Sequence, residues 1–596
     1  MPYSPNKLYK FWQELKRRRV IHVITVYASA AFVIIELVGN LTEPLNLPTS
    51  LSTIVIIVLA VGFPPAIILS WLYDLTSGSF ERTGPLEDIQ EEGKARVPNA
   101  WKIATYVSFL VIAGLVVFNL VSRGDVLKPG MIQSLAILPF DNYTGDEKLD
   151  YVAAGMHSAL IGDMGKLGAL RITGKNSSSV FNNSGKSAPD IARELDVEAL
   201  VEPAVMYYGD SIIIQIKLIT LYPKEKQLFV EDYMVDKSQA LNLFSKISKQ
   251  IADEIMIKLS PEEERLFAKS RTIDREAYDD YLKALGSLDF TRESLYKSLE
   301  YLNHAVEREP DWAPLYTGLA LVWMDIQQMG LESTSITFPK IYTNLNKSLE
   351  LDPDLSDAHN LSAMIAYLME WEWEKSEKEF LKALAINPSD AGSRIIYAHL
   401  LCILQRYDEA LPQARLALEL DPLNPNIKVW ASVVLMAVGD FKSALELGEE
   451  VAATDPNYFM AYAAIENAAF YIRDYNKVME ASKHILVEKI DFKEVDRIFG
   501  ESGFVAANEE ILRQLEIISL NGFVAPVVMA QRYMMVDQAG KAMDWFEKGF
   551  EVRDPNMPYI AVPGFFCEPL FDNPRFIEIL QKMNLPLPIG NTASTQ

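Results

Sequence analysis

Hydrophobic positions follow three different patterns along the chain. Within the first 123 residues they gather into long runs, at about 20–38, 54–73 and 103–121. A helix needs roughly 20 consecutive apolar residues to cross a hydrocarbon layer about 30 Å thick. The three runs therefore predict three transmembrane helices within residues 20–123.

The middle of the chain alternates between short apolar runs and helical periodicity. Ser134–Phe140 is a continuous apolar run that is typical of a buried strand. Gly209-Asp210 separates two further runs, 198–208 and 211–221, as expected for a β-hairpin. Apolar residues then recur every four positions from Leu243 to Leu259, which indicates an amphipathic helix. Residues 131–260 are predicted to form a small α/β domain.

The last part of the chain repeats with a nearly fixed period. Prolines at predicted helix boundaries lie 35, 34 and 34 residues apart, at Pro353, Pro388, Pro422 and Pro456. A period near 34 with a proline after the second helix is typical of stacked helix pairs. One pair cannot bury its own apolar face, so neighbouring pairs stack and leave a long concave surface. We expect an all-α repeat solenoid with a C-terminal cap over residues 276–586.

Basic residues next to the apolar runs predict the orientation in a membrane. Lys7, Lys10, Lys16 and Arg17-Arg18-Arg19 precede the first run. The 39–53 connection has no Lys or Arg, whereas the 74–102 connection has four. The positive-inside rule then places residues 1–19 in the cytoplasm and everything after Arg123 on the far side. We expect a multi-pass inner-membrane protein whose large C-terminal region is periplasmic.

The first run is interpreted as an anchor and not as a cleaved signal peptide. It ends in Ile34-Ile35-Glu36-Leu37 and lacks a small-residue cleavage site. Glu36 lies near the outer end of the predicted span, where solvation or a helix–helix hydrogen bond would satisfy its carboxyl group. Its role, and whether the spans signal or only anchor, stay open.

Charge changes the picture of the partners. The chain has 596 residues and a net charge of −24, but residues 1–123 carry 11 Lys/Arg and 9 Asp/Glu. The remaining 45 basic and 71 acidic residues therefore give the rest a net charge of −26. So acidic a body repels phosphate backbones, which argues against nucleic-acid binding. The two cysteines, Cys402 and Cys567, suffice for neither a disulfide framework nor a Cys-rich zinc site.

Catalytic signals are weak throughout the chain. Gly168 and Gly174-Lys175 faintly suggest a phosphate loop, but the spacing is one residue too long and Asn176 stands where Ser or Thr should bind magnesium. His157 and Asp163 are six residues apart and do not share a helix face. The six histidines show no paired metal-ligand spacing. We expect no enzyme, no catalytic residues, no metal and no cofactor.

Several motifs resemble a bacterial membrane-anchored family. Phe11–Arg18, Gly62–Pro65 and Trp71–Thr76 resemble the membrane module of proteins that combine such spans with a TolB-like domain and tetratricopeptide repeats. Ser134–Phe140 with Asp141-Asn142, and Val201-Glu202-Pro203, resemble the TolB-like domain, which the family uses for protein interaction. Some members are adenylate cyclases with a catalytic domain ahead of the spans. Only about 19 residues stand there in this chain, so the resemblance implies a member without that domain.

The repeats themselves resemble tetratricopeptide repeats over about residues 276–555. Small residues such as Ala410, Ala414 and Ala417 recur where two helices of a pair would touch. The resemblance implies a peptide-binding groove on the concave face, lined by the first helix of each pair. Mapped by spacing, the groove residues are Asn360, Met364, Tyr367, Ile395, His399, Val429, Val433, Met436, Asn467 and Phe470.

The predicted groove has no Lys or Arg clamp, so an apolar or helical ligand suits it better than a C-terminal carboxylate. The alternative is that these residues pack against a neighbouring repeat or the α/β domain. We expect a membrane-anchored scaffold that binds a protein or peptide; homo-oligomer formation stays open. The second hypothesis is a transmembrane signalling subunit that couples an extracytoplasmic ligand to a cytoplasmic partner.

Overall fold

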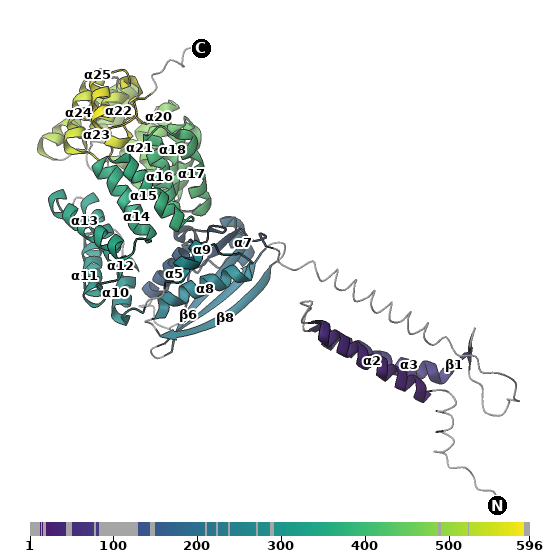
Figure 1. Ribbon diagram of the computed structural model, residues 1–596. Helices are drawn as coiled ribbons and strands as arrows, with labels where there is room; N and C mark the ends of the chain where they lie inside the picture. Colours follow the sequence, from purple (N-terminus) through teal and green to yellow (C-terminus); the bar gives the residue numbers. More distant parts are fainter. Residues whose placement is uncertain are drawn as a thin grey trace, which may run out of the picture. The chain divides into compact units, whose positions relative to one another are not determined.

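The structure is a computed structural model of the chain. The structure describes positions 12 and 15 and residues 20–42, 50–76, 79–82, 129–143, 150–208, 211–221, 225–236, 239–269, 272–286, 291–329, 331–486, 490–522 and 524–588. The chain divides into two compact units, Met1–Val126 and Leu127–Gln596. Each unit is described by itself below (Figure 1).

The first unit is built around a pair of apolar helices, α2 (Val20–Thr42) and α3 (Ser50–Leu72). They contact one another where the Tyr27 hydroxyl donates a hydrogen bond of 2.8 Å to the carbonyl of Leu59. The Tyr27 ring also lies 5.4 Å from that of Phe63. A short antiparallel ribbon follows, formed by β1 (Tyr73–Thr76) and β2 (Ser79–Arg82).

The structure supports one of the three predicted transmembrane helices. Val20–Val38 within α2 is long and apolar enough to cross a membrane. The second prediction, 54–73, falls in α3, a helix of 23 residues that contains Pro64 and Pro65 and whose apolar stretch Ile54–Ile68 lies in the described part of the chain. The third prediction, 103–121, lies outside the described residues. The described part of the chain therefore has one candidate span, near the N-terminus.

The second unit begins with a mixed sheet, which confirms the predicted α/β domain. Its strands are β3 (Ser134–Ile137), β4 (Asp141–Asn142), β5 (Arg171–Ile172), β6 (Ala199–Tyr208), β7 (Ser211–Thr220) and β8 (Lys226–Asp236). The sheet order is β5-β3-β6-β7-β8, with β4 paired to β6. Strands β3, β4 and β5 pair in parallel, whereas β6, β7 and β8 form the antiparallel meander that the Gly209-Asp210 turn predicts.

Helices cover the sheet on both faces because the strand residues alternate between them. Leu135 and Ile137 point into the larger core with α5 (Asp150–Met164) and α8 (Ala240–Glu254), while Ala136 packs with α7 (Ala188–Leu195) on the other face. Two short helices complete the domain: α6 (Lys175–Ser179) and α9 (Pro261–Phe267).

The core of the α/β domain continues into the first repeat helices. One apolar cluster contains Met156 of α5, Leu282 of α10 (Arg275–Gly286) and Leu315 of α12 (Ala313–Gln328). Gly155 permits this approach, since a Cβ at that position would overlap the Leu282 side chain. The α/β domain and the array are therefore packed together within the second unit.

The array consists of antiparallel helix pairs, as the 34-residue period predicts. The further helices are α11 (Arg292–Arg308), α13 (Thr334–Leu351), α14 (Ser356–Ile365) with the π-helix η4 (Ala366–Glu370), α15 (Trp373–Ile386), α16 (Ala391–Ile403), α17 (Tyr407–Leu420), α18 (Pro425–Ala437), α19 (Phe441–Thr454), α20 (Phe459–Tyr471), α21 (Tyr475–Ile485), α22 (Phe492–Asn521), α23 (Pro526–Met535), α24 (Ala539–Val552) and α25 (Pro574–Lys582). The 3₁₀ turns η5 (Met557–Tyr559) and η6 (Glu568–Leu570) lie between α24 and α25.

The turn inside each pair repeats with the same geometry. The first helix ends in a left-handed residue at Trp371, Gln405, Gly439 and Arg473, each 34 positions after the last. Backbone hydrogen bonds such as Arg406 N to Leu401 O and Asp440 N to Leu435 O then close each helix end. A glycine stands at one of the four positions, so three turns place a side chain in a conformation that favours glycine.

Candidate functional site

The inner layer of the array is formed by the first helices of successive pairs. Helices α14, α16, α18 and α20 follow one another along the array; α14 contacts the preceding first helix α12, and α18 contacts both α16 and α20. We call their shared surface, together with η4, the groove face. Residues 554–573, which connect α24 to α25, are called the strap. The structure places the strap on the groove face.

The strap is fixed at its beginning by a buried chain of polar groups. The hydroxyl of Tyr559 meets the hydroxyl of Tyr367 in η4 and lies 2.9 Å from Nδ1 of His399 in α16. Nε2 of His399 lies 2.8 Å from the backbone carbonyl of Trp430. The rings of Tyr559 and Tyr367 meet edge to face, with centroids 6.3 Å apart. Tyr559 thus bridges two successive first helices.

Further along, the strap reaches the next two first helices. Gly564, with φ of +89°, lies so close to Met436 of α18 that a Cβ would come within 2.9 Å of the Met436 Cβ. The ring of Phe566 packs edge to face on Phe470 of α20, with centroids 4.9 Å apart. The backbone N–H of Phe566 donates to the Tyr471 hydroxyl at 2.7 Å, and that hydroxyl donates to Glu568.

The residues on either side of the strap are also tied to η4, α15 and the turn after α16. Arg553 donates to the carbonyl of Met369 in η4. After α25, Trp373 Nε1 donates to the Met583 carbonyl at 2.9 Å. Gln405 Nε2 donates to the Pro586 carbonyl at 2.9 Å. Polar contacts thus join residues about 180 to 210 positions apart in sequence and hold the strap at both ends.

The strap covers the surface on which the sequence predicts the peptide groove. Tyr367, His399, Met436 and Phe470 contact strap residues directly. Ile395 and Val429 are buried, and Met364 and Val433 are half-buried against cores of the array. Asn360 and Asn467 are half-buried on α14 and α20. The ten predicted residues lie on first helices or on η4, and four of them contact the chain's own C-terminal segment.

A second cluster lies where α6 of the α/β domain meets the turn between α17 and α18. The carboxylate of Asp421 accepts a hydrogen bond of 2.8 Å from the backbone N–H of Ser177 and another from its hydroxyl. The Leu423 N–H donates to the Ser177 hydroxyl oxygen at 2.8 Å, and the Gly174 N–H donates to the Leu420 carbonyl at 2.7 Å. The first turn of α6 therefore receives a carboxylate from the array.

The two preceding turns of the array dock the α/β domain in the same way. Ser389 accepts from the Ile172 N–H at 3.2 Å and donates to the Leu170 carbonyl at 3.3 Å. Lys269 forms ion pairs with Asp352 at 2.7 Å and Asp354 at 2.8 Å. These contacts recur with the period that the prolines mark in the sequence, since each involves a turn at Pro353, Pro388 or Pro422.

The residues that faintly suggest catalysis in the sequence make packing contacts and hydrogen bonds within the fold. The Gly174-Lys175 segment opens α6 beneath Asp421, and the Gly168 N–H donates to Glu263 at 2.8 Å. His157 is buried with Nε2 lying 2.8 Å from the Ile137 carbonyl, and burial lowers its pKa to about 4. Asp163 pairs with Lys166 and accepts a hydrogen bond from Ser245. The structure does not bring His157 and these glycines together around a substrate-sized space.

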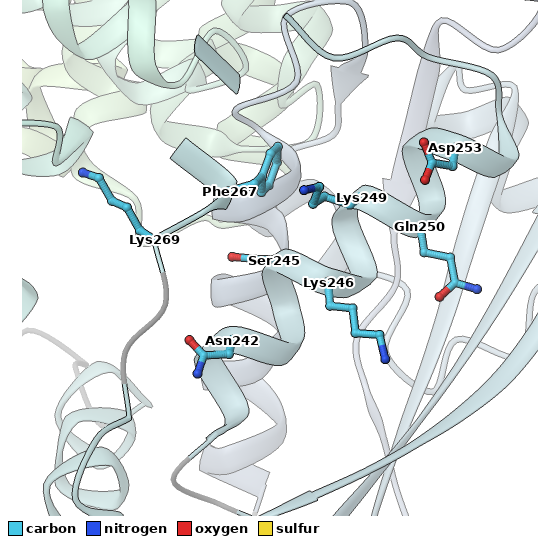
Figure 2. Close-up of a pocket in the computed structure, with 8 residues that line it drawn as sticks. All are labelled: Asn242, Ser245, Lys246, Lys249, Gln250, Asp253, Phe267 and Lys269. Atoms are coloured by element: carbon cyan, nitrogen blue, oxygen red, sulfur yellow. The ribbon is translucent and has the colours of Figure 1, made fainter. Parts of the chain in front are cut away.

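One cleft of about 570 Å³ lies beside α8 and next to Phe267 and Lys269. Figure 2 shows that its basic side chains diverge: Lys249 points toward Phe267, whereas Lys246 and Gln250 extend toward the sheet. The amine of Lys269 is already paired with Asp352 and Asp354. The lining therefore offers no convergent set of polar groups.

Metal and thiol chemistry find little support in the described ranges. Among these residues no group of three His, Cys, Asp or Glu side chains is placed to hold a metal ion. Cys402 and Cys567 are both buried and free, and burial raises the pKa of the Cys402 thiol to about 12. Neither cysteine is a reactive thiolate in this environment.

No protein-family model matches the sequence. The chain is 26% identical over 190 residues to "Putative adenylate cyclase 3" of Rhizobium meliloti (strain 1021). That stretch covers 32% of this chain and 32% of that protein, so the chain spans about a third of the length of the curated relative it matches. The similarity is distant and partial.

Solved structures with paired helices match the repeat region. The structure of Pseudomonas aeruginosa pilF is 18% identical to this chain. The match covers 41% of this chain and 94% of the pilF chain, with a TM-score of 0.25. YrrB, a TPR protein with an unusual peptide-binding site, is 19% identical to this chain. The match covers 31% of this chain and 90% of the YrrB chain, with a TM-score of 0.23. A chain in the structure of the APC/C hetero-tetramer Cut9-Hcn1 is 15% identical to this chain. The match covers 51% of this chain and 56% of that chain, with a TM-score of 0.35. These scores carry no argument about function.

Proposed function

We propose that this chain is a membrane-attached scaffold that binds polypeptide segments through the groove face of its repeat array. One observation carries the proposal: the groove face accommodates an apolar polypeptide segment, because the strap, which begins with a 3₁₀ turn, already packs along it. Between Tyr559 and Phe566 the strap contacts η4, α16, α18 and α20 in turn. Repeat arrays of this kind use their extended concave surfaces for binding.

The chemistry of the groove face favours an apolar ligand. Its contacts with the strap are mostly aromatic and aliphatic, with polar anchors at Tyr367 and His399 and at Tyr471. Aromatic anchors in desolvated pockets supply most of the energy in protein interfaces. The proposed function is binding without a covalent step.

The proposal extends to the location and the domain type. An anchor at α2, with residues 1–19 cytoplasmic and the α/β domain and array periplasmic, would agree with the basic residues that precede α2. The α/β domain would belong to the TolB-like type that its motifs resemble. Alkaline phosphatase fused after residue 588 should then be active in cells. A fluorescent cytoplasmic reporter at the same position, with silent phosphatase, would contradict this sidedness.

The partial similarity to a protein named as an adenylate cyclase makes enzymatic activity the alternative to exclude. We expect purified full-length protein, incubated with ATP and Mg²⁺ or Mn²⁺, to form no cyclic AMP above the background of a mock purification. Turnover proportional to protein concentration would contradict a purely binding role.

Site-specific photocrosslinking in cells tests the scaffold itself. The half-buried Asn467 of α20 lies three positions before Phe470 and so shares its helix face. Glu446, which is 59% exposed in its side chain, lies on α19, a second helix of the array. Benzoylphenylalanine is placed at each of these two positions. The expected result is an adduct with one protein partner at Asn467 and none at Glu446. Equal adducts at both positions, or adducts at neither, would count against a groove-binding scaffold.

A further inference from the structure

We propose that the cleft beside α8 is a second docking surface and that it binds an acidic polypeptide segment of a partner protein. Carboxylates of this segment pair with Lys246 and Lys249, and an apolar side chain between them packs against Phe267. The inference goes beyond the proposed function, because the cleft is lined by α8 and the end of α9 and does not belong to the groove face.

The cleft follows one polar stripe of α8. Its lining residues on this helix recur at intervals of three and four positions and therefore share a helix face: Asn242, Ser245, Lys246, Lys249, Gln250 and Asp253. The opposite stripe is buried in the core of the α/β domain, with Leu243, Ile247 and Ile251. The step from Asn242 to Asp253 corresponds to a rise of about 16 Å along the helix. The cleft is therefore long enough for about five residues of extended chain.

Two cations of this stripe are available to a ligand. Lys246 and Lys249 are exposed, and neither has a carboxylate partner among the residues that the structure describes. The amine of Lys246 lies 5.6 Å from the centroid of the Tyr233 ring, a contact that leaves its charge unpaired. Lys269, in contrast, is neutralised by two aspartates of the array. A ligand can pair with both amines of the stripe without breaking an ion pair of the fold.

The charge of the lining is opposite in sign to that of the protein as a whole. The chain has a net charge of −24, whereas the lining contains three lysines and one aspartate, Asp253, at one end of the stripe. Asp163, which accepts a hydrogen bond from Ser245, is already paired with Lys166. The Debye length is about 8 Å at physiological ionic strength, so a ligand in the cleft interacts with these lysines more strongly than with distant acidic groups. The cleft therefore favours a negatively charged ligand.

The directions of the two lysines favour a polypeptide over a small anion. Lys249 points toward Phe267, whereas Lys246 extends toward the sheet (Figure 2). Sites for small molecules hold a few polar groups that converge on the ligand, and these two amines do not converge. Successive carboxylates along a polypeptide segment can meet the amines one after the other. The cleft is also a recess of about 570 Å³, which a flat bilayer surface cannot enter.

Phe267 gives the cleft an apolar wall. Its ring belongs to the core of the α/β domain and also lines the cleft. The methylene stems of Lys246 and Lys249 extend this apolar surface, because long basic side chains lay their stems on apolar surface and keep the charged group in water. An aliphatic or aromatic residue of the partner can pack there. The expected motif is therefore one apolar residue with acidic residues on both sides.

Fluorescence anisotropy with a labelled acidic peptide tests the inference. The probe is the peptide Glu-Glu-Leu-Glu-Glu with a fluorophore at one end, and the receptor is the full-length protein in micelles of a non-ionic detergent. Each exposed ion pair contributes up to about five-fold in affinity. Lys246→Glu combined with Lys249→Glu removes two pairs and adds repulsion, so this cleft variant should bind the probe at least about ten-fold more weakly than the wild type. Raising the ionic strength from about 0.01 M to about 1 M should also weaken wild-type binding, because the Debye length falls from about 30 Å to about 3 Å.

Lys541→Glu combined with Lys548→Glu is the matched control. Both lysines are exposed on α24, and each contacts an aromatic ring, as Lys246 does. This control variant has the same net charge as the cleft variant and should bind the probe as the wild type does. The basic peptide Lys-Lys-Leu-Lys-Lys should bind the cleft variant at least about five-fold more tightly than the control variant, which also shows that the cleft variant is folded. Equal losses of the acidic probe in the two variants, or equal binding of the basic peptide, overturn the inference.

Competition on the unaltered protein distinguishes a polypeptide from other anions. Inorganic phosphate and glycerophosphoserine, the headgroup of an anionic lipid, should displace the probe only at concentrations about 100-fold above that of the unlabelled peptide, because linked carboxylates bind the two amines together. Displacement by either anion at the concentration of the peptide would assign the cleft to a small anion or a lipid and overturn the inference. A peptide with serine in place of leucine should bind at least about three-fold more weakly. Equal affinity for the two peptides, or no binding of the probe by the wild type at low ionic strength, would also overturn it.

Discussion

The repeat array presents two surfaces that hold neighbouring segments in opposite ways. Its turns dock the α/β domain through polar groups, with Asp421 accepting from Ser177 as the most buried example. Its groove face holds the strap mainly through rings and aliphatic side chains, as at Phe470 and Met436. The first contact repeats along the array, whereas the second changes from one helix to the next.

This difference follows from which positions the repeat keeps constant. A turn needs a polar residue before its proline in every repeat, so Asp352, Asn387 and Asp421 recur at the same edge. The inward positions of first helices are free to vary, so each can be shaped for a different residue of the strap. The repeated turns of the array are suited to holding the α/β domain permanently. The groove face, whose residues differ from one first helix to the next, is suited to binding one specific segment.

The largest effect is expected where the strap is anchored. Tyr559→Ala removes a buried ring and leaves the Tyr367 hydroxyl and His399 Nδ1 without a partner. Truncation of a buried aromatic residue costs about 3–5 kcal/mol. Urea unfolding of the array, followed by tryptophan fluorescence, should shift by that amount. A shift no larger than that of Tyr316→Ala, whose hydroxyl donates to the Pro310 carbonyl outside the groove face, would contradict the anchor.

The pH dependence of the groove face should come next in size. The pKa of His399 falls from 6.5 to about 4 on folding, so the unfolded chain binds its proton first as the pH drops. Stability contributed by neutral His399 is therefore present above pH 6.5 and is lost between pH 6.5 and 4, by about 3 kcal/mol at most. The wild type should lose more stability than His399→Asn over this range. Parallel pH profiles would contradict the buried neutral ring.

A smaller effect is expected at the docked edge. Gly174→Ala would place a Cβ into the Asp421 carboxyl group, although the φ of −63° is ordinary for alanine. Overpacking of this kind costs about 1–3 kcal/mol. Hydrogen exchange should speed up in α6 and at residues 419–423. Gly162→Ala is the control, because a Cβ there meets nothing within 4 Å. Equal exchange in both variants would contradict tight docking.

The smallest effect is expected at the exposed end of the same edge. Lys269 is 41% exposed in its side chain, and its ion pairs with Asp352 and Asp354 are open to solvent. Such pairs contribute about 0–1 kcal/mol. Lys269→Ala should therefore shift the urea midpoint of the second unit less than Gly174→Ala does. A larger shift would show that the period of the turns, and not burial, sets the strength of docking.

Local patterns in the sequence predicted much of the fold. The hairpin around Gly209-Asp210 and the buried run at Ser134 form β6, β7 and β3, because alternation and turn residues act within a few positions. The amphipathic pattern that begins at Leu243 predicted a helix that continues to Leu259, but α8 ends at Glu254. The predicted second span at 54–73 coincides with α3 (Ser50–Leu72), of which the described part contains the apolar stretch Ile54–Ile68.

The candidate site was harder to predict, for a different reason. The positions of Tyr367, His399, Met436 and Phe470 on first helices follow from the repeat period. Their neighbours do not, because Tyr559 and Phe566 lie 96 to 192 positions away in a segment without periodicity. The uncharged stretch 557–566 was the available signal, and it resembles an ordinary cap.

The sequence by itself determined the array, the α/β domain and the apolar N-terminal helix, since periodicity and turn chemistry act over short distances. Only the tertiary structure decided that the groove face is filled and that the turns hold the α/β domain. Both depend on contacts between residues far apart in the chain, as between Ser177 and Asp421, which are 244 positions apart. Such contacts are selected by shape and by buried hydrogen bonds, and no local pattern records them.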